Sequence, residues 1–343
     1  MKNIIIAIGC CFFVNINAQT IVVGFYNCEN FYDTTNQANV IDEDFLPNSS
    51  KAYNTEAYSL KAKHISSVLY KIGLIDNTSG ISLFGLAEIE NKIVLNNLLE
   101  NPLIKKYHYK YIHFDSKDPR GVDVALIYNP ANFIPYQFKP ISLTDSTHFI
   151  TYATRDILYV KGQLNHVWVN VLVNHWPSRR GGESSTKRIW AASVCKKFMD
   201  SVQVLDPTSK FIVMGDFNDN PNNKSLELLK LNNPFSDLFK NGIGSIAFRD
   251  SWNLFDQILL SPNWQIPNNP IAKADSMAFS TPYNNLTKYK PIIYTNPDMI
   301  ESQGKYRGYP KRTYDGDRFR GGYSDHFPVA LIFKPNLSGN TLK

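Results

Sequence analysis

Short apolar runs alternate with polar turns along most of the chain, and each run has about the length of a strand. These runs predict strands over 20–27, 81–87, 107–113, 122–128, 138–143, 156–162, 167–173, 211–214, 255–260 and 329–333. Apolar positions at helical spacing predict helices over 55–73, 92–103, 186–201 and 220–231. Because helices alternate with pairs of strands, we expect sheets whose outer faces are covered by helices.

The first 18 residues have a different pattern from the rest of the chain. Lys2 precedes an apolar run from Ile4 to Val14, and Ala18 is a small residue suited to cleavage. This pattern is typical of a secretory signal, and the run is too short to span a bilayer. We therefore expect an exported protein, periplasmic or secreted, without stable membrane insertion. A lipoprotein signal at Gly9-Cys10 is a weaker alternative, because Cys10 would truncate the apolar run.

The remaining chain has the composition of an ordinary folded protein, with 43% hydrophobic residues among all 343. No repeat or linker divides it, so we expect a single domain over 19–343, and a monomer. Loss of one lysine with the leader leaves a net charge of 35 − 30 = +5. This balance is compatible with a polyanionic ligand. Cys28 and Cys195 fall in a predicted strand and helix, which favours two buried thiols over a disulfide.

Polar side chains follow the ends of several predicted strands. In Ile212-Val-Met-Gly-Asp-Phe-Asn-Asp219 the apolar run ends at Gly215 and delivers Asp216 and Asn218. If strand geometry persists, both side chains leave on one face and Phe217 turns into the core. A carboxylate beside an amide suits the positioning of water against an anionic group, although this stretch alone also fits a plain turn. The full set is Asn27, Glu88, His175, Asp216, Asn218, Asp256, Asp325 and His326.

These motifs, in this order, resemble the endonuclease/exonuclease/phosphatase superfamily. The resemblance rests on Phe-Tyr-Asn27, Leu-Ala-Glu88-Ile-Glu, Gly-Asp216-Phe-Asn, Phe-Asp256-Gln-Ile and Ser-Asp325-His326, which span residues 20 to 334. It implies an α/β (α+β) fold, a four-layer sandwich of two mixed β-sheets face to face with helices outside. It also implies a hydrolase acting on phosphoester bonds.

A phosphodiester is anionic, so its hydrolysis requires charge neutralisation and an oriented water. Glu88 is the best candidate ligand for Mg²⁺ or Mn²⁺, which prefer hard oxygen donors, and Asn27 and Asp325 would complete the shell. A structural Ca²⁺ stays open. His326 would activate water or bind the phosphate as imidazolium, and the resemblance assigns Asp256 as its partner.

The other candidate catalytic residues have different roles. Asp216 would position the nucleophile or a proton, and Asn218 would donate to a phosphate oxygen. His175 lies where deoxyribonuclease-like and phosphatase-like members carry histidine, and where apurinic endonucleases tend to have tyrosine. Arg155, Arg179 and Arg180 are candidate substrate-binding residues, because guanidinium pairs with phosphate in a bidentate manner.

The segment 261–323 is the part least similar to the family, and its prolines argue against long regular elements. Between Glu301 and Tyr323, six Lys and Arg residues alternate with aromatic residues. This pattern fits a surface that binds nucleic acid, and it fits equally a covering loop whose tyrosines pack on the sheet.

We expect an exported, divalent-metal-dependent nuclease without strong sequence preference. The first alternative is a phosphatase, or a phosphodiesterase for lipid head groups or small molecules, of the same fold. The shared residues act on the phosphate and do not distinguish these substrates. The second alternative is a non-catalytic binding module, which would have lost some of Glu88, Asp216, Asn218 and His326, whereas all four are present.

Overall fold

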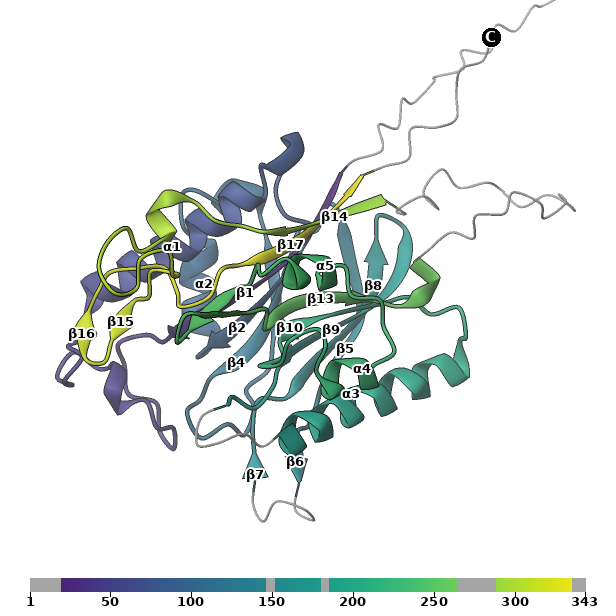
Figure 1. Ribbon diagram of the computed structural model, residues 1–343, viewed down its shortest axis with the longest axis horizontal. Coiled ribbons are helices and arrows are strands. Elements are labelled where there is room, and N and C mark those ends of the chain that lie inside the picture. Colours follow the sequence, from purple (N-terminus) through teal and green to yellow (C-terminus); the bar gives the residue numbers. More distant parts are fainter. Residues whose placement is uncertain (1–19, 146–151, 180–184, 265–287, 335–343) are drawn as a thin grey trace, which may run out of the picture.

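Two β-sheets face each other, and helices cover the outer face of each (Figure 1). The computed structural model describes residues 20–145, 152–179, 185–264 and 288–334. The predicted four-layer arrangement of two mixed sheets is confirmed. The predicted leader and Arg180 lie outside the described residues.

The first sheet has six strands in the order β14-β17-β1-β2-β4-β3. β1 and β2 are parallel, and the other neighbours are antiparallel. The bounds are β1 (Ile21–Phe31), β2 (Leu83–Ile89), β3 (Lys110–His113), β4 (Asp123–Tyr128), β14 (Lys288–Ile293) and β17 (Val329–Lys334).

The second sheet has five strands in the order β13-β10-β9-β8-β5. β9 and β10 are parallel, and the other pairs are antiparallel. The bounds are β5 (Phe133–Ile141), β8 (Ile157–Leu164), β9 (Val167–His175), β10 (Phe211–Asp216) and β13 (Asp256–Leu260). In both sheets the parallel pair places two C-terminal strand ends side by side at one edge.

Three hydrophobic cores separate the four layers. Phe25, Val173 and Met214 belong to the core between the sheets. The helices α1 (Thr55–Ile72) and α2 (Lys92–Leu99) pack on the outer face of the first sheet. The helix α3 (Ser185–Leu205) packs on the second sheet, where α4 (Lys224–Leu228) also contributes. Alternate residues of each strand therefore face two different apolar layers, as the long apolar runs require.

Short elements occupy the connections. They are α5 (Ser236–Lys240), the two-stranded pairs β6 (Thr144–Asp145) with β7 (Tyr152–Ala153), β11 (Ile246–Phe248) with β12 (Ser251–Asn253), and β15 (Tyr314–Asp315) with β16 (Arg318–Phe319), and the 3-10 turns η1 (Glu43–Phe45), η2 (Ile75–Asn77), η3 (Lys105–Tyr107), η4 (Pro262–Trp264) and η5 (Pro297–Met299).

The structure corrects the sequence analysis in two places. The sequence analysis did not predict β14, an edge strand of six residues that includes Pro291. An edge strand tolerates proline because one of its sides lacks a pairing partner. The central strand also continues through Gly215 to Asp216. A Cβ at Gly215 would lie 2.3 Å from the backbone oxygen of Asn174, so glycine allows the close approach of β9.

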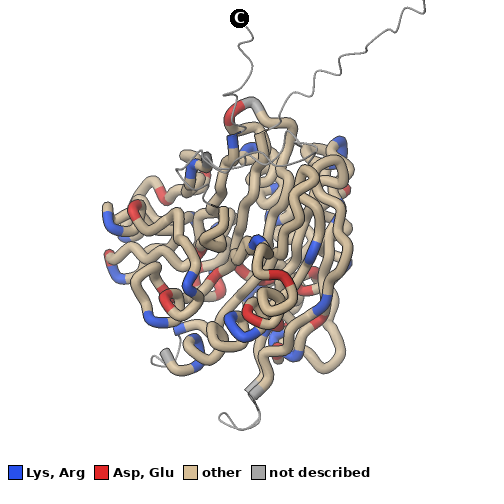
Figure 2. The backbone as a smooth tube through the Cα atoms, turned by 90° about the vertical axis from the view of Figure 1, so that its right-hand side faces the viewer, with Lys and Arg blue, Asp and Glu red and all other residues tan. Residues whose placement is uncertain are grey.

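Two further predictions concern the thiols and the charge. Cys28 and Cys195 are buried free thiols, as expected. Lys and Arg residues are spread over the molecule with acidic residues among them, without a single basic stripe (Figure 2). Among the described helices, none has the length and apolar character needed to cross a membrane.

Candidate active site

Polar side chains from both sheets meet at the edge where the parallel strands end. Asp216 on β10 lies directly opposite His175 on β9 and Asp256 on β13. On the first sheet, Asn27 is paired with Ala87, the neighbour of Glu88. The amide Nδ2 of Asn27 donates to Oδ2 of Asp216 at 3.0 Å and thereby joins the two sheets. Residues almost three hundred positions apart thus form one cluster.

His326 and Asp256 form a buried pair in which Nδ1 lies 2.6 Å from Oδ2 of the carboxylate. Burial opposes a charge on the imidazole, but Asp256, Asp216 and Asp325 outweigh it and raise the pKa of His326 well above its usual value. Ser245 donates to the same carboxylate oxygen at 2.6 Å. The pair therefore holds an imidazolium in a fixed orientation.

Asp216 is the central carboxylate of the cluster. Its Oδ2 lies 3.7 Å from Nε2 of His175 and 3.9 Å from Nε2 of His326. Burial raises the pKa of Asp216, the charge of His326 lowers it, and that of Asp256 raises it again. A carboxyl group with a raised pKa can hold or accept a proton near neutral pH.

His175 differs from His326 in charge although both are buried. Burial, with Arg155 and Arg120 nearby, lowers the pKa of His175 well below its usual value, so this imidazole is neutral. Its Nε2 lies 3.8 Å from Oε1 of Glu88. The site therefore contains one neutral and one cationic imidazole, each facing the same carboxylate.

Glu88 and Asp325 present the carboxylate oxygens of the predicted metal site. Glu88 Oε2 accepts from the backbone N–H of Asn30 at 2.8 Å, and Oε1 faces Nδ2 of Asn27 at 3.4 Å. Asp325 Oδ1 lies 3.9 Å from Nε2 of His326. Burial would raise the pKa of Asp325, but His326 and Arg312 lower it, so the group is ionised.

These donors fit a hard divalent cation. Both carboxyl groups are partly accessible, at 14% and 27% side-chain exposure, and carboxylate oxygens are preferred by such ions. Asn27 directs its amide nitrogen toward Glu88 and Asp216, while its oxygen accepts from the backbone of Glu29. In this arrangement Asn27 orients the carboxylates of Glu88 and Asp216.

Asn218 adopts a conformation that the strand pattern did not predict. Its φ of 51° is left-handed, and its backbone N–H donates to Oδ1 of Asp216 at 2.9 Å. Its side chain donates to the carbonyl of Trp176 at 3.0 Å. Phe217 does turn into the core, as expected, where it packs on the ring of Trp176. Asn218 thus closes the turn that holds Asp216.

The predicted substrate arginines are engaged within the protein. Arg155 is buried, and its guanidinium pairs with Asp118 at 3.0 Å and donates to the carbonyl of Trp176 at 2.9 Å. Arg179 pairs with Asp219 at 2.9 Å and donates to the carbonyl of Asn218. Both arginines therefore stabilise the loops that follow His175 and Asp216. They affect the site by holding these loops in place.

Two arginines beyond the three predicted substrate-binding arginines interact with carboxylates of the site. Arg312 pairs with Asp325 at 2.6 Å and lies 3.6 Å from Glu29. The pKa of Arg120 is raised by Glu88 and Asp118 against the effect of burial. Both belong to loops without an apolar pattern. In the sequence, the only sign of a role for Arg312 was its alternation with aromatic residues in the segment 261–323.

The described part of the segment 261–323 both packs on the fold and borders the site. Tyr314 is buried against Tyr53, as a covering loop requires, whereas Arg312 faces the carboxylates. Arg320 is paired with Glu301 at 3.1 Å. The described part of this segment is therefore both a cover and a wall of the site.

Paired sheets with helices outside, and a buried imidazolium–carboxylate pair beside accessible carboxylates, define a phosphoester hydrolase of the metal-assisted class. A sequence model of the Endonuclease/Exonuclease/phosphatase family matches residues 22–334, and the chain belongs to this family. Members of the family hydrolyse phosphoesters with the help of divalent metal ions.

Solved structures share the fold at low sequence identity. An endonuclease/exonuclease/phosphatase family protein from Bacteroides thetaiotaomicron is 15% identical, with a TM-score of 0.52 over 92% of this chain and 98% of that chain. A mannosyl-6-phosphatase from the same organism is 14% identical, with a TM-score of 0.51 over 92% and 100%. TDP2 from D. rerio, complexed with a single-strand DNA product, is 12% identical, with a TM-score of 0.52 over 92% and 99%. No curated protein sequence matches.

Proposed function

We propose that this protein is an exported nuclease that hydrolyses phosphodiester bonds of nucleic acid with Mg²⁺ or Mn²⁺. The observation that carries the chemistry is the hydrogen bond between His326 and Asp256 beside Asp216. This arrangement places the imidazolium of His326 close to Asp216, a carboxyl group with a raised pKa. An anionic ester and its attacking water require these two kinds of group.

His326 binds a non-bridging phosphate oxygen through its free Nε2–H, since Nδ1 is held by Asp256. Asp216 orients the attacking water and accepts its proton. The 3.9 Å between Nε2 of His326 and Oδ2 of Asp216 leaves room for one oxygen atom that contacts both. Neutral His175 donates to or accepts from the same region without adding charge.

Glu88 and Asp325 would hold a divalent ion, which would supply Lewis-acid stabilisation of the charge that develops on the phosphate. Arg312 pairs with Asp325 and lowers the pKa of that carboxyl group, and the charge of Arg120 interacts with Glu88. Mg²⁺ and Mn²⁺ suit this donor set because both prefer carboxylate oxygen and water as ligands.

A row of aromatic rings leads away from the site and supports a polymeric substrate. Phe327, next to His326, stacks with Trp252 at 6.0 Å between ring centroids. Trp252 lies 6.1 Å from Tyr309, and Tyr309 lies 5.7 Å from Tyr306, which is 42% exposed. Exposed rings near a phosphate site bind unstacked bases.

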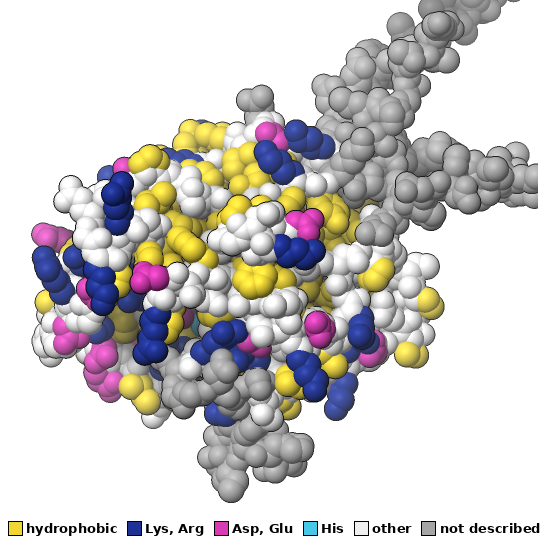
Figure 3. Space-filling view, viewed as in Figure 1, with side chains coloured by type: hydrophobic (Ala, Val, Ile, Leu, Met, Phe, Trp, Pro, Cys, Tyr) yellow, Lys and Arg dark blue, Asp and Glu magenta, His cyan; other side chains and the backbone are white. Residues whose placement is uncertain are grey.

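Basic side chains accompany this row. Arg249 stacks on Phe248, which is 63% exposed at the tip of the β11–β12 hairpin. Lys and Arg side chains alternate with Asp and Glu around β15 and β16, at the left and lower left of the face in Figure 3. Phosphate contacts by basic residues beside stacking rings favour single-stranded nucleic acid over small phosphate esters.

A panel of single-stranded DNA, duplex DNA, RNA, a sugar phosphomonoester and sphingomyelin, each assayed with Mg²⁺, Mn²⁺ or chelator, tests this proposal. We expect metal-dependent cleavage of nucleic acid that is lost in His326→Ala and retained in His108→Asn, a change of an exposed imidazole. Tyr306→Ala should weaken cleavage of single strands more than that of a dinucleotide. Faster turnover of the phosphomonoester or of sphingomyelin would reject the nuclease assignment in favour of the corresponding alternative.

Export is the second part of the proposal. It is supported by the apolar run that follows Lys2 and by the small residue Ala18. Mass spectrometry of the protein recovered outside the cytoplasm should give an N-terminus at Gln19. A cytoplasmic protein that retains Met1 would reject export.

A further inference from the structure

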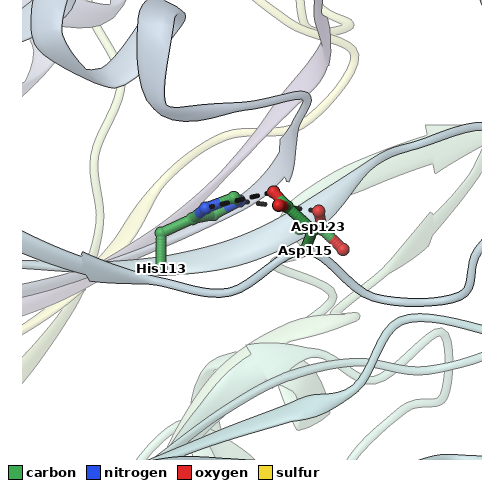
Figure 4. Close-up of side chains that lie close together, drawn as sticks. All are labelled: His113, Asp115 and Asp123. Atoms are coloured by element: carbon green, nitrogen blue, oxygen red, sulfur yellow. Dashed lines mark ion pairs between the residues drawn. The ribbon is translucent and has the colours of Figure 1, made fainter. Parts of the chain in front are cut away.

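A second cluster of histidine and acidic residues lies on the first sheet, apart from the active site. His113 ends β3, Asp123 begins β4, and Asp115 lies on the loop between them. Figure 4 shows the three side chains directed toward one another. Their ligand atoms all lie within 4.8 Å of one another. The proposed hydrolysis uses none of these residues.

His113 is buried without satisfying its polar atoms. Its side chain has 0% exposure, and neither ring nitrogen forms a hydrogen bond with the part of the chain that the structure describes. Nε2 lies 3.5 Å from Oδ2 of Asp123, and Nδ1 lies 3.8 Å from Oδ1 of Asp115. Burial of a polar ring without a partner is costly, and native proteins rarely leave such a group unsatisfied.

Asp123 is nearly as buried as His113. Its side chain is 4% exposed, and Oδ1 accepts from the backbone N–H of Ser116 at 2.9 Å, which leaves Oδ2 facing the imidazole. Asp115 is the open side of the cluster, because its side chain is 67% exposed. A ligand can therefore reach the buried imidazole and carboxylate past Asp115.

We propose that His113, Asp115 and Asp123 form a second divalent-metal site, selective for Zn²⁺. The separation of 3.5 Å between nitrogen and oxygen is long for a hydrogen bond. It matches two ligands of one tetrahedral ion, because ligands about 2.1 Å from zinc lie roughly 3.4 Å apart. One ring nitrogen and one oxygen from each carboxylate supply three ligands, and water completes the tetrahedron.

The imidazole determines the choice of ion. Ca²⁺ and Mg²⁺ take oxygen ligands, whereas zinc binds nitrogen and carboxylate oxygen together. The active-site carboxylates, in contrast, suit a hard ion. The chain thus contains two sites of different ligand chemistry on the same side of the first sheet.

The ion would anchor a loop that contacts the active site. Residues 115–123 carry Asp118, which pairs with the buried Arg155, and Arg120, whose charge interacts with Glu88. Both ends of this loop are ligands in the proposed site. Zinc binding therefore fixes the loop at its base and stabilises the folded chain.

The test measures zinc content and thermal unfolding in the full chain. Protein stripped with chelator is dialysed against Zn²⁺ in the presence of excess Mg²⁺, and bound zinc is measured by mass spectrometry of the metal. We expect His113→Asn and Asp123→Asn to lose about one zinc ion per chain relative to the wild type. Zinc should raise the melting temperature of the wild type and of Glu88→Gln, and should leave that of His113→Asn unchanged.

Two further variants keep the test decisive. His108→Asn changes an exposed imidazole of the same sheet region and should retain the zinc. Asp115→Asn alters an exposed carboxylate and should fold normally, yet its zinc affinity should fall by about tenfold or more. Wild-type zinc content in a folded His113→Asn would overturn the proposal, and so would unchanged zinc affinity in Asp115→Asn.

Discussion

Two of the buried histidine–carboxylate groups, His326 with Asp256 and His113 with Asp123, contain the same kinds of residue in different geometries. His326 lies 2.6 Å from Asp256, and a serine hydroxyl supports the same carboxylate. His113 lies 3.5 Å from Asp123, and its ring forms no hydrogen bond with the described residues. One pair is satisfied by the protein, and the other has a gap of the size that an ion fills.

This difference separates two uses of histidine. A direct hydrogen bond fixes the imidazole and raises its pKa, which suits a cation that meets a phosphate. An imidazole that is buried without a hydrogen-bond partner among the described residues can instead coordinate a metal ion through a ring nitrogen. The distance between ring nitrogen and carboxylate therefore says more about function than the residue types do.

The largest expected effect is the loss of activity in His326→Ala. Turnover should fall by about a thousandfold or more, since the variant removes the group that contacts the phosphate. Steady-state rates with Mg²⁺ on a nucleic-acid substrate measure it, and circular dichroism confirms the fold. Activity within tenfold of the wild type would contradict the site.

His113→Asn sharpens the comparison by changing the other imidazole. Its effect reaches the active site only through the loop that carries Arg120. Turnover should fall by less than about tenfold, with the loss greater at elevated temperature. A loss equal to that of His326→Ala would mean that the two groups do not differ in role.

The next expected effect is a change in the pH dependence of activity in Asp256→Asn. An asparagine oxygen can still accept from His326 Nδ1, but the negative charge that raises the pKa is gone. If the imidazolium binds phosphate, activity is lost as pH rises through its pKa. This alkaline limb of kcat/KM should therefore move down by about 1 to 3 pH units.

Asp123→Asn is the matched control and should leave the limb in place. If His326 instead acts as a general base, activity rises with pH through the same pKa, and Asp256→Asn shifts an acid limb downward. The direction of the limb thus decides between the two roles that the sequence left open.

Sequence patterns predicted the strands and their polar ends because both depend on local order. Glu88, Asp216 and Asp256 each end or begin an apolar run. Strand pairing places Asp216 opposite Asp256, and Asn27 links Asp216 to Glu88 across the two facing sheets. The register between the parallel strands β9 and β10 also places His175 opposite Asp216.

Other features depend on contacts between distant segments, which a pattern does not contain. Arg155 has the residue type of a phosphate ligand, and only the fold shows that Asp118 binds it. Arg312 lies in a proline-rich segment and reaches Asp325 because that segment covers the site. His113 follows an ordinary strand, and its buried position beside Asp123 depends on the pairing of β3 with β4.

The smallest expected effect tests how the satisfied pair is held. Ser245 donates to Asp256 Oδ2, and its oxygen accepts from the backbone N–H of Asp256 at 3.2 Å. Ser245→Ala removes both bonds from a buried carboxylate and should lower the free energy of unfolding by about 1.5 to 3 kcal/mol. Turnover should fall by less than about tenfold, because His326 still contacts the carboxylate.

Urea denaturation measures this change against Ser201→Ala, whose hydroxyl is exposed on α3 and whose loss should stay within about 0.5 kcal/mol. If Ser245→Ala is as stable as this control, the hydroxyl does not support the Asp256 carboxylate. The contrast with the His113–Asp123 pair would then rest on the 2.6 Å contact between His326 and Asp256 alone. A clear loss of stability, together with zinc-dependent stability at His113, would show that one fold satisfies two buried imidazoles by different means.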